Sequence, residues 1–243
     1  MDEKLLRPLR ETVDAIATAI VGVRGRGFSG IRETQYHLDV AADNAALAIL
    51  VPAGFQVVSE ESGVTGSGDY TVVIDPIDGS TNCDRGVPFF ATSLAVVHRG
   101  ELIAGVVSNQ ATGTLYEAVR GGGASRDGVA IHPSGEKDDA NALVSFSGWP
   151  SRNLGWAQMR ALGAAALEIC LVADGSLDAF AVAQHSTLNP WDYLAGMLIG
   201  REAGAFIADY RGEELVTADR IVRRPVIAGS EELLTTFLEA DTL

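Results

Sequence analysis

The sequence predicts a mixed α/β protein, and three observations lead to this prediction. Hydrophobic residues make up 47% of the 243 residues, which is enough apolar material for a sizeable core. Apolar runs rich in β-branched residues, typical of buried strands, alternate with longer segments typical of helices. A polar stretch at residues 133–141 separates two halves that both contain this mixture. We therefore expect residues 1–140 to form one α+β half and residues 141–243 to form an α/β half.

The first half is predicted to begin with helices and to continue with strands. Leu9, Val13 and Ile16 recur at helical spacing, which predicts an amphipathic helix over residues 5–24. The basic, glycine-rich loop at residues 24–30 could contact an anionic substrate, although a solvated loop is the simpler interpretation. An alanine- and leucine-rich helix is predicted next, up to about residue 51. The segments predicted as strands in this half are residues 55–59, 70–74, 89–97, 102–108 and 114–119.

The second half is predicted to alternate strands and helices more regularly. A strand at residues 142–147 precedes a loop around Trp149 and a helix near Trp156. A later long helix is expected to begin with Pro190 and to end at Gly204, since Pro favours the first turn of a helix and Gly its end. The other predicted elements are a helix at 164–172, strands at 178–182, 206–209 and 224–228, and a capped helix at 230–240.

Charge and cysteine content exclude several classes of protein. The net charge is −14, from 18 Lys and Arg against 32 Asp and Glu, so the chain repels nucleic acid and anionic membranes. Cys83 and Cys170 are far apart in sequence and predict neither a zinc site nor a disulfide framework. The N-terminal residues lack the layout of a signal peptide, and no apolar run is long enough to span a bilayer. We expect a soluble, cytoplasmic protein that binds neither nucleic acid nor a membrane.

The run Asp-Pro-Ile-Asp-Gly-Ser-Thr-Asn at residues 75–82 is the strongest candidate for a functional site. It follows an apolar strand, so the carboxylates of Asp75 and Asp78 arrive together at a strand end, directly before a turn at Gly79. That turn is typical of a helix N-terminus, where free backbone amides favour an anion. Carboxylates and an anion can share one place if a cation such as Mg²⁺ lies between them. On these residues alone an ordinary turn is the alternative.

Glu60 supports the interpretation as a metal site. It ends the apolar strand that precedes the strand of Asp75. If these two strands are neighbours in a sheet, then Glu60, Asp75 and Asp78 meet at one edge of that sheet. The sequence therefore predicts a phosphate site that is bridged by metal ions.

Together these motifs resemble the inositol monophosphatase family of metal-dependent, lithium-sensitive phosphatases. The matching segments are Asp43 before a helix and residues 59–63, 75–82, 191–196 and 202–204, in the family's order. The resemblance covers essentially the whole chain. It implies a layered α/β/α/β/α sandwich, usually in a homodimer, with the metal site between the two halves and a small phosphorylated metabolite as substrate.

The resemblance also implies which groups bind metal. Glu60, Asp75 and the carbonyl group of Ile77 would bind a first Mg²⁺. Asp75, Asp78 and Asp192 would bind a second ion, and Glu60 would help to hold a third. Mn²⁺ could replace Mg²⁺ in these positions.

Roles in catalysis and substrate binding are implied in the same way. Ser80 and Asp43 would orient a water molecule that the metal activates, with the Ser80 hydroxyl group hydrogen-bonded to Asp43 and passing on a proton. Glu60 would act in catalysis through the metal. The backbone amides of Gly79 and Ser80 would receive the phosphate group. The side chains expected to contact the rest of the substrate are Arg160, His185 and Asp192.

The resemblance leaves the substrate open. Inositol 1-phosphate is the first choice, although Val182 stands where inositol-selective members have a Glu. Fructose 1,6-bisphosphate is next, because residues 81–88 and 109–113 look like the dual-specificity branch known from archaea; histidinol phosphate and 3′-phosphoadenosine 5′-phosphate follow. Haloacid-dehalogenase-type phosphatases have one residue between their two aspartates, whereas Asp75 and Asp78 are separated by two, which argues against a phospho-aspartyl intermediate. A catalytically silent interaction protein and a calcium-binding module are the alternatives from other classes.

Overall fold

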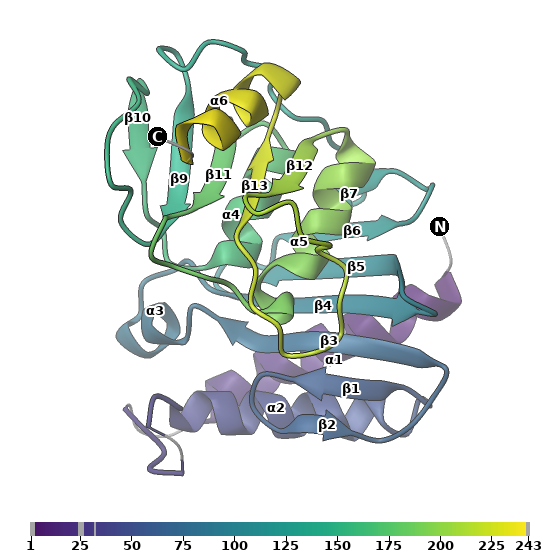
Figure 1. Ribbon diagram of the computed structural model, residues 1–243. Helices are drawn as coiled ribbons and strands as arrows, with labels where there is room; N and C mark the ends of the chain where they lie inside the picture. Colours follow the sequence, from purple (N-terminus) through teal and green to yellow (C-terminus); the bar gives the residue numbers. More distant parts are fainter. Residues whose placement is uncertain (1–2, 24–26, 32, 242–243) are drawn as a thin grey trace.

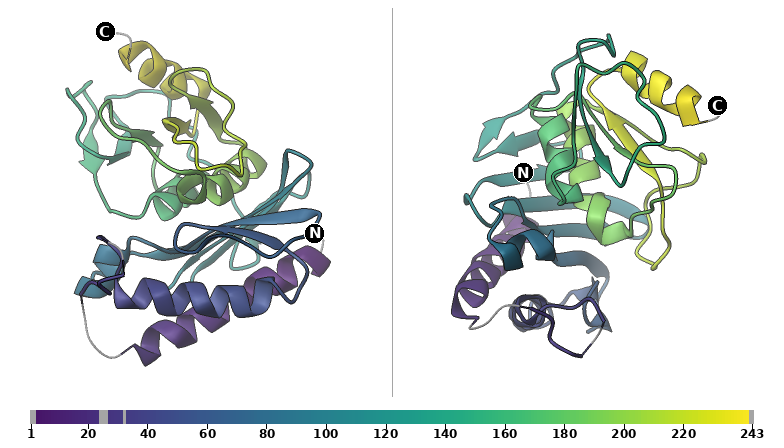
Figure 2. Two further views of the ribbon diagram at one scale, coloured as in Figure 1. Left: turned by 60° about the horizontal axis from the view of Figure 1, so that its bottom comes forward. Right: turned by 90° about the vertical axis from the view of Figure 1, so that its left-hand side faces the viewer.

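The computed structural model describes residues 3–23, 27–31 and 33–241, so the basic part of the first loop, residues 24–26, lies outside it. The helices and strands form layers in the order helix pair, sheet, helix pair, sheet and single helix (Figure 1, Figure 2). This confirms the layered α/β/α/β/α sandwich. Within the described residues, no helix is both long enough and apolar enough to cross a membrane.

The first sheet has eight strands in the order β2-β1-β3-β4-β5-β6-β7-β8. Their bounds are β1 Gln56–Ser59, β2 Gly63–Thr65, β3 Tyr70–Asp78, β4 Ala91–His98, β5 Glu101–Asn109, β6 Leu115–Val119, β7 Ala124–Arg126 and β8 Val129–Ala130. Helices α1 (Glu3–Gly22) and α2 (His37–Leu50) cover one face, and the short α3 (Ser80–Arg85) follows β3. Since β3 is buried on both faces over residues 72–78, its sequence is a continuous apolar run up to the two aspartates.

The second sheet has five strands in the order β10-β9-β11-β13-β12. Their bounds are β9 Leu143–Ser147, β10 Gln158–Arg160, β11 Ala179–Val182, β12 Phe206–Asp209 and β13 Pro225–Ala228. The helix α6 (Glu231–Asp241) covers its outer face. Helices α4 (Ala165–Ala173) and α5 (Pro190–Ala203) lie between the two sheets (Figure 2).

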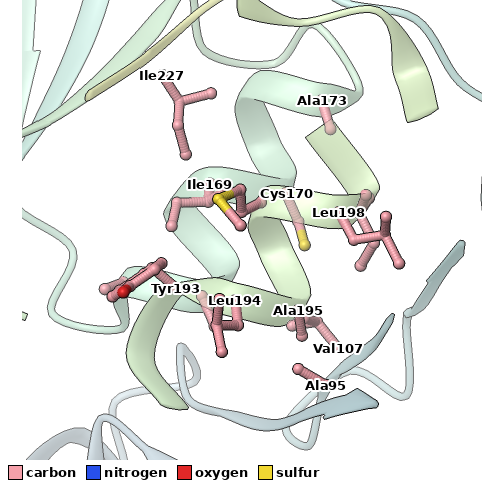
Figure 3. Packing of buried hydrophobic residues seen from close by; sticks show 14 of the residues in the cluster. Ala95, Val107, Ile169, Cys170, Ala173, Tyr193, Leu194, Ala195, Leu198 and Ile227 are labelled. Carbon is pink, nitrogen blue, oxygen red and sulfur yellow. The ribbon is translucent and has the colours of Figure 1, made fainter. Parts of the chain in front are cut away.

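The inner helices α4 and α5 form the centre of the molecule. Apolar side chains from both helices and both sheets meet there, among them Ile169 of α4, Val107 of β5 and Ile227 of β13 (Figure 3). Because α5 contacts protein on all sides, its residues 193–200 are all buried and largely apolar. A Cβ atom on Gly196 would lie 2.8 Å from Cγ2 of Ile169, so this glycine lets α5 approach α4 closely.

Around Trp156 the structure differs from the predicted elements. The described chain bends there and then forms the edge strand β10, so the predicted helix is wrong. Gly155 has a φ of +102°, and its amide donates a hydrogen bond to Oδ1 of Asn153 at 2.8 Å, which makes a turn. The predicted boundary after residue 140 falls between β8 and β9. Helices α4 and α5 pack against both sheets in one core. The division of the chain into two halves stays a prediction.

Candidate active site

Two neighbouring parallel strands bring Glu60 and Asp75 to the same edge of the first sheet. β1 pairs with β3 in parallel, with Ser59 opposite Ile74. The amide of Glu60 donates to the carbonyl oxygen of Ile74 at 3.2 Å, which continues the pairing by one residue. The predicted meeting of these strand ends is therefore confirmed.

A bulge in β3 turns the Asp75–Asp78 segment out of the regular ladder. The register of β3 against β4 shifts between these two residues, where Pro76 has no amide hydrogen to donate to a neighbouring strand. The hydroxyl group of Thr92 donates to the carbonyl oxygen of Pro76 at 2.9 Å, and the amide of Ile77 donates to Oδ1 of Asp75 at 3.0 Å. These bonds hold the bulge and the carboxylate of Asp75 at the sheet edge.

A further carboxylate, that of Asp192, comes from the first turn of α5. Asn189 and Asp192 form a capping box, in which the Asn189 amide donates to Oδ2 of Asp192 at 2.7 Å. Pro190 occupies the first helical position, where its missing amide hydrogen is not needed. Glu60, Asp75 and Asp192 each present a carboxylate oxygen, and these oxygens lie within 4.8 Å of one another.

The electrostatics of these three carboxylates fit a divalent cation. Burial, and next the charge of Asp192, raise the pKa of Glu60 to about 8. Burial and the charge of Asp78 raise the pKa of Asp192 to about 8, and burial and the charge of Glu60 raise the pKa of Asp75. A bound cation offsets both the burial and the repulsion. Because all of the ligand atoms are oxygens, a hard ion such as Mg²⁺ suits the site.

Asp78 lies beside this cluster and also caps the N-terminus of α4. Its two carboxylate oxygens accept hydrogen bonds from the amides of Ala165 and Ala166 at 3.2 and 2.7 Å. Burial raises the pKa of Asp78 to about 7, although these amides oppose the rise. Each carboxylate oxygen keeps a further lone pair for a cation. Asp78 therefore connects the first sheet to the inner helices at the edge of the metal site.

The carboxylate beside Ser80 is that of Asp39, whereas the sequence analysis expects Asp43. The side chain of Ser80 is near enough to lower the pKa of Asp39, although its hydroxyl hydrogen is donated to the carbonyl oxygen of Ile77, and burial outweighs this and raises the pKa of Asp39 to about 6. Asp43 lies one helical turn further along α2, is 6% exposed, and accepts hydrogen bonds from the hydroxyl groups of Ser59 at 2.5 Å and Ser62 at 3.3 Å. The predicted hydrogen bond between Ser80 and Asp43 is therefore wrong.

The turn at Gly79 brings Ser80 over the bulge of β3. Gly79 has a φ of +87°, and a Cβ atom there would lie 2.8 Å from the carbonyl oxygen of Gly163, so only glycine fits. The hydroxyl group of Ser80 donates to the carbonyl oxygen of Ile77 at 2.8 Å. The structure thus places together the predicted carbonyl ligand, the predicted hydroxyl group and the free amides at the start of α3.

Two cavities open on to the carboxylates. The first, named here the Ser80 cavity, has a volume of about 350 Å³ and is lined by residues that include Gln35, Asp39, Glu60, Glu61, Ser80, Trp191 and Arg220. The second, named here the Asp78 cavity, has a volume of about 280 Å³ and is lined by residues that include Asp78, Ser147, Gly148, Gly163, Ala165, Leu188 and Asp192. Cavities of roughly this size hold small molecules. Both cavities are acidic: Asp39, Glu60 and Glu61 line the first beside Arg220, and Asp78, Glu168 and Asp192 line the second among mainly small residues.

Two of the predicted substrate contacts lie away from these cavities. The guanidinium group of Arg160 donates to the Met159 carbonyl oxygen at 3.0 Å and to Oε1 of Gln158 at 2.6 Å, both on its own strand β10. His185 is exposed on the loop between β11 and α5. The two residues border neither of the described cavity walls. Contact of Arg160 or His185 with substrate stays a prediction.

Asp39 and Arg220 are the functional candidates that sequence reasoning misses. Asp39 begins the same helical stretch as Asp43, and its place next to the first turn of the helix is the signal that could have selected it. Arg220 lies in an irregular segment between β12 and β13 with no motif around it. Of the described residues that line the Ser80 cavity, Arg220 alone carries a positive charge.

The fold and the site together define a class of protein. Buried and half-buried carboxylates from two parts of the chain surround a place for a cation, and the Ser80 hydroxyl group, the Asp39 carboxylate and backbone amides at the start of α3 lie next to it. This set of groups suits the hydrolysis of phosphate esters with a metal ion.

Comparison with known proteins agrees with this class. The model of the inositol monophosphatase family matches residues 38–240. A relative from Thermococcus kodakarensis named fructose-1,6-bisphosphatase/inositol-1-monophosphatase is 39% identical over 224 residues, which cover 89% of this chain and 85% of that protein. The Nus factor SuhB of Pseudomonas aeruginosa is 34% identical over 226 residues, which cover 82% of this chain and 80% of the relative.

A solved structure gives the same result. The crystal structure described as an inositol monophosphatase-fructose 1,6 bisphosphatase has a TM-score of 0.83 and 30% sequence identity, and the match covers 96% of this chain and 98% of that one. The chain therefore belongs to the inositol monophosphatase family, and it is a metal-dependent phosphatase.

Proposed function

We propose that the protein is a Mg²⁺-dependent phosphomonoesterase that acts on small polyol and sugar phosphates, with inositol 1-phosphate and fructose 1,6-bisphosphate as its candidate substrates. The observation that carries this proposal is the group of three carboxylate oxygens within 4.8 Å of one another, contributed by both halves of the chain. The printed names of the relatives, which combine the two activities, support the choice of substrates.

The proposed ligands are those expected from the sequence. Glu60, Asp75, Asp192, Asp78 and the carbonyl group of Ile77 would hold two or three Mg²⁺ ions at the edge of the first sheet. When bound, these ions neutralise the phosphate oxygens and make water a stronger nucleophile at neutral pH.

Ser80 and Asp39 are proposed to hold the attacking water and to remove its proton. The water would donate a proton to Oγ of Ser80 while the hydroxyl group, which donates to the carbonyl oxygen of Ile77 in the structure, turns and passes its own proton to the nearby Asp39 carboxylate. Burial raises the pKa of Asp39 to about 6, so this carboxylate is ionised at neutral pH and is still a better proton acceptor than an exposed one. The amides of Gly79 and Ser80 are proposed to bind the phosphate oxygens.

The two cavities provide separate places for the attacking water and for the alcohol part of the phosphate ester. Phosphoryl transfer needs the attacking and leaving oxygens roughly in line on opposite sides of phosphorus. We propose that the water is held in the Ser80 cavity and that the alcohol leaves towards the Asp78 cavity, which is lined by Asp78 and Asp192. The carboxylates and small residues of that cavity, which has no basic side chain, suit the hydroxyl groups of a polyol better than a nucleotide.

The test is phosphate release from inositol 1-phosphate and fructose 1,6-bisphosphate in parallel, each with Mg²⁺, with EDTA and with added Li⁺. We expect Mg²⁺-dependent turnover of both substrates, loss of turnover in EDTA, and inhibition by Li⁺. Turnover of one substrate alone would assign the chain to that activity. No release from either, with Mg²⁺ binding intact, would contradict the proposed substrates and direct the search to histidinol phosphate and 3′-phosphoadenosine 5′-phosphate.

Replacement of Asp192 tests the metal site itself. Asp192→Asn keeps an oxygen that can accept the capping hydrogen bond from the Asn189 amide, but it removes the charge. We expect the variant to fold normally by circular dichroism and to lose turnover and metal binding. Normal turnover by a folded Asp192→Asn variant would contradict the assignment of this ligand.

A second candidate function has one observation in its favour. The Pseudomonas aeruginosa relative is named Nus factor SuhB, a name that states no phosphatase activity. A chain that bound Mg²⁺ but hydrolysed none of the four phosphate esters would favour the interaction function. The homodimer expected from the family is also proposed here, and sedimentation velocity of the full chain tests it.

A further inference from the structure

The segment between β12 and β13 reaches from the second sheet to the metal site. In Figure 1 it extends past the N-terminal end of α5 to the level of β3 in the first sheet. Near the end of this segment, Nη2 of Arg220 donates a hydrogen bond to the backbone carbonyl oxygen of Glu60 at 2.5 Å. The same guanidinium group lies over the indole ring of Trp191, with its central carbon 4.8 Å from the ring centroid.

These two contacts join the residues next to two carboxylates of the cluster. Glu60 is itself one of the three, and Trp191 directly precedes Asp192. We propose that Arg220 is a positioning residue, which holds Glu60 of the first sheet and Asp192 of α5 at the separation that binds the metal ion. This inference rests on the proposed function, because it assigns Arg220 a task within the same site.

The indole ring of Trp191 gives Arg220 a fixed surface to lie on. Trp191 is 3% exposed, and its carbonyl oxygen accepts a hydrogen bond from the hydroxyl group of Ser93 in β4 at 2.8 Å. A planar guanidinium group can stack on an aromatic ring and donate a hydrogen bond at its edge at the same time. The ammonium group of a lysine has no planar face, so it cannot make both contacts in this geometry.

The positive charge of Arg220 and its positioning contacts would change the affinity for the metal ion in opposite directions. Arg220 shares the Ser80 cavity with the carboxylates of Asp39, Glu60 and Glu61. A positive charge there repels a metal cation, so loss of the charge alone should strengthen metal binding. Loss of the positioning contacts should weaken metal binding instead. The sign of the change in affinity therefore separates the two roles.

The experiment measures binding of Mn²⁺ to the full chain without substrate, by electron paramagnetic resonance of the free ion. The variants are Arg220→Ala, Arg220→Lys and, as a matched control, Arg201→Ala. Arg201 is an exposed arginine in the last turn of α5, at the other end of that helix from Asp192. We expect Arg220→Ala to bind Mn²⁺ about 10-fold more weakly, as is typical when a group that orients a ligand is lost. Arg220→Lys should be weakened as well, and Arg201→Ala should match wild type.

Kinetics add a readout that a general loss of stability does not give. For Arg220→Ala we expect a higher Mg²⁺ concentration for half-maximal rate, with KM for the phosphate ester unchanged once Mg²⁺ is saturating. Mn²⁺ affinity equal to or tighter than that of wild type in Arg220→Ala would overturn the proposal, as would full rescue by Arg220→Lys. A rise in KM alone would also overturn it, because it would assign Arg220 to the substrate. Wild-type protein that bound no Mn²⁺ would overturn the proposed function as well.

Discussion

Replacement of Asp39 tests which carboxylate acts with Ser80: Asp39, as the structure indicates, or Asp43, as the sequence analysis expects. Asp39→Asn keeps an oxygen for the capping hydrogen bond from the Tyr36 amide, which is 2.8 Å long. It removes the proton acceptor beside Ser80. We expect kcat to fall by about 100-fold or more, since a positioned base is worth 10²–10⁴ in rate. Mn²⁺ binding should be retained, because Asp39 is outside the group of three ligands.

Asp43→Asn is the matched comparison on the same face of α2. Asp43 is an acceptor for two serine hydroxyl groups, those of Ser59 and Ser62. We expect a loss of about 1–3 kcal/mol in the free energy of unfolding, because hydrogen bonds to a buried charge are weakened. The value of kcat should change only slightly, and chemical denaturation beside steady-state kinetics measures both. Inactive Asp43→Asn together with active Asp39→Asn would restore the pairing of Ser80 with Asp43.

The same two residues show how far the site could be predicted from the sequence. Glu60, Asp75 and Asp78 follow apolar runs, so their meeting at strand ends was predictable from pattern alone. Asp39 and Asp43 are four residues apart and lie on one side of a helix, where sequence spacing cannot tell which carboxylate faces Ser80. Arg220 could not have been found, because its contacts to Glu60 and Trp191 depend on the path of an irregular segment.

At the scale of elements, the close approach of α4 and α5 makes Gly196 a sensitive position. A Cβ atom there would lie 2.8 Å from Cγ2 of Ile169 and 3.1 Å from the carbonyl oxygen of Ala166. Gly196→Ala must therefore push the helices apart, and we expect it to lower the free energy of unfolding by about 1–3 kcal/mol. Because α4 donates two amides to Asp78, metal affinity should fall as well.

Gly200→Ala is the control on the same helix. A Cβ atom at Gly200 would have its nearest neighbour, Cδ1 of Ile207, at 3.4 Å, which is an ordinary contact. Alanine is favoured over glycine inside a helix by about 1 kcal/mol, so this variant should be as stable as wild type or more stable. Thermal and chemical unfolding of the two variants gives the comparison. Equal stability of Gly196→Ala and Gly200→Ala would show that the helices have room to adjust.

The elements themselves were predicted best where one physical signal dominated. Strands β3, β4 and β5 are buried apolar runs, and the capping box and Pro190 mark the start of α5. Around Trp156 the signals were weak, and a turn at Gly155 with a short edge strand replaced the predicted helix. Edge strands of this length depend on pairing with another strand, here the preceding strand β9, which the three residues of β10 do not themselves encode.

At the scale of the whole molecule, the first sheet and the inner helix α5 meet in a site that is unfavourable without metal. Glu60 and Asp75 extend from the first sheet and Asp192 from α5, and folding brings their charges together. Burial and repulsion raise the pKa values of Glu60 and Asp192 to about 8 and that of Asp78 to about 7. The ordinary values, which apply to the unfolded chain, are 4.5 for Glu and 3.8 for Asp. At pH values between the ordinary and the raised pKa values, the folded chain without metal therefore binds more protons than the unfolded chain.

This difference in proton binding predicts how metal-free stability depends on pH. Stability falls with rising pH wherever the folded state binds more protons, so in EDTA the unfolding temperature should fall as pH rises from about 5 to about 8. Saturating Mg²⁺ offsets the charges, so the stabilisation by Mg²⁺ should be small at about pH 5 and should grow towards pH 8. Thermal unfolding across this range, with EDTA and with Mg²⁺, measures both effects. Asp192→Asn removes one titrating group and should reduce the slope. A Mg²⁺-induced shift that is equal at the two ends of the range would contradict a carboxylate metal site that titrates on folding.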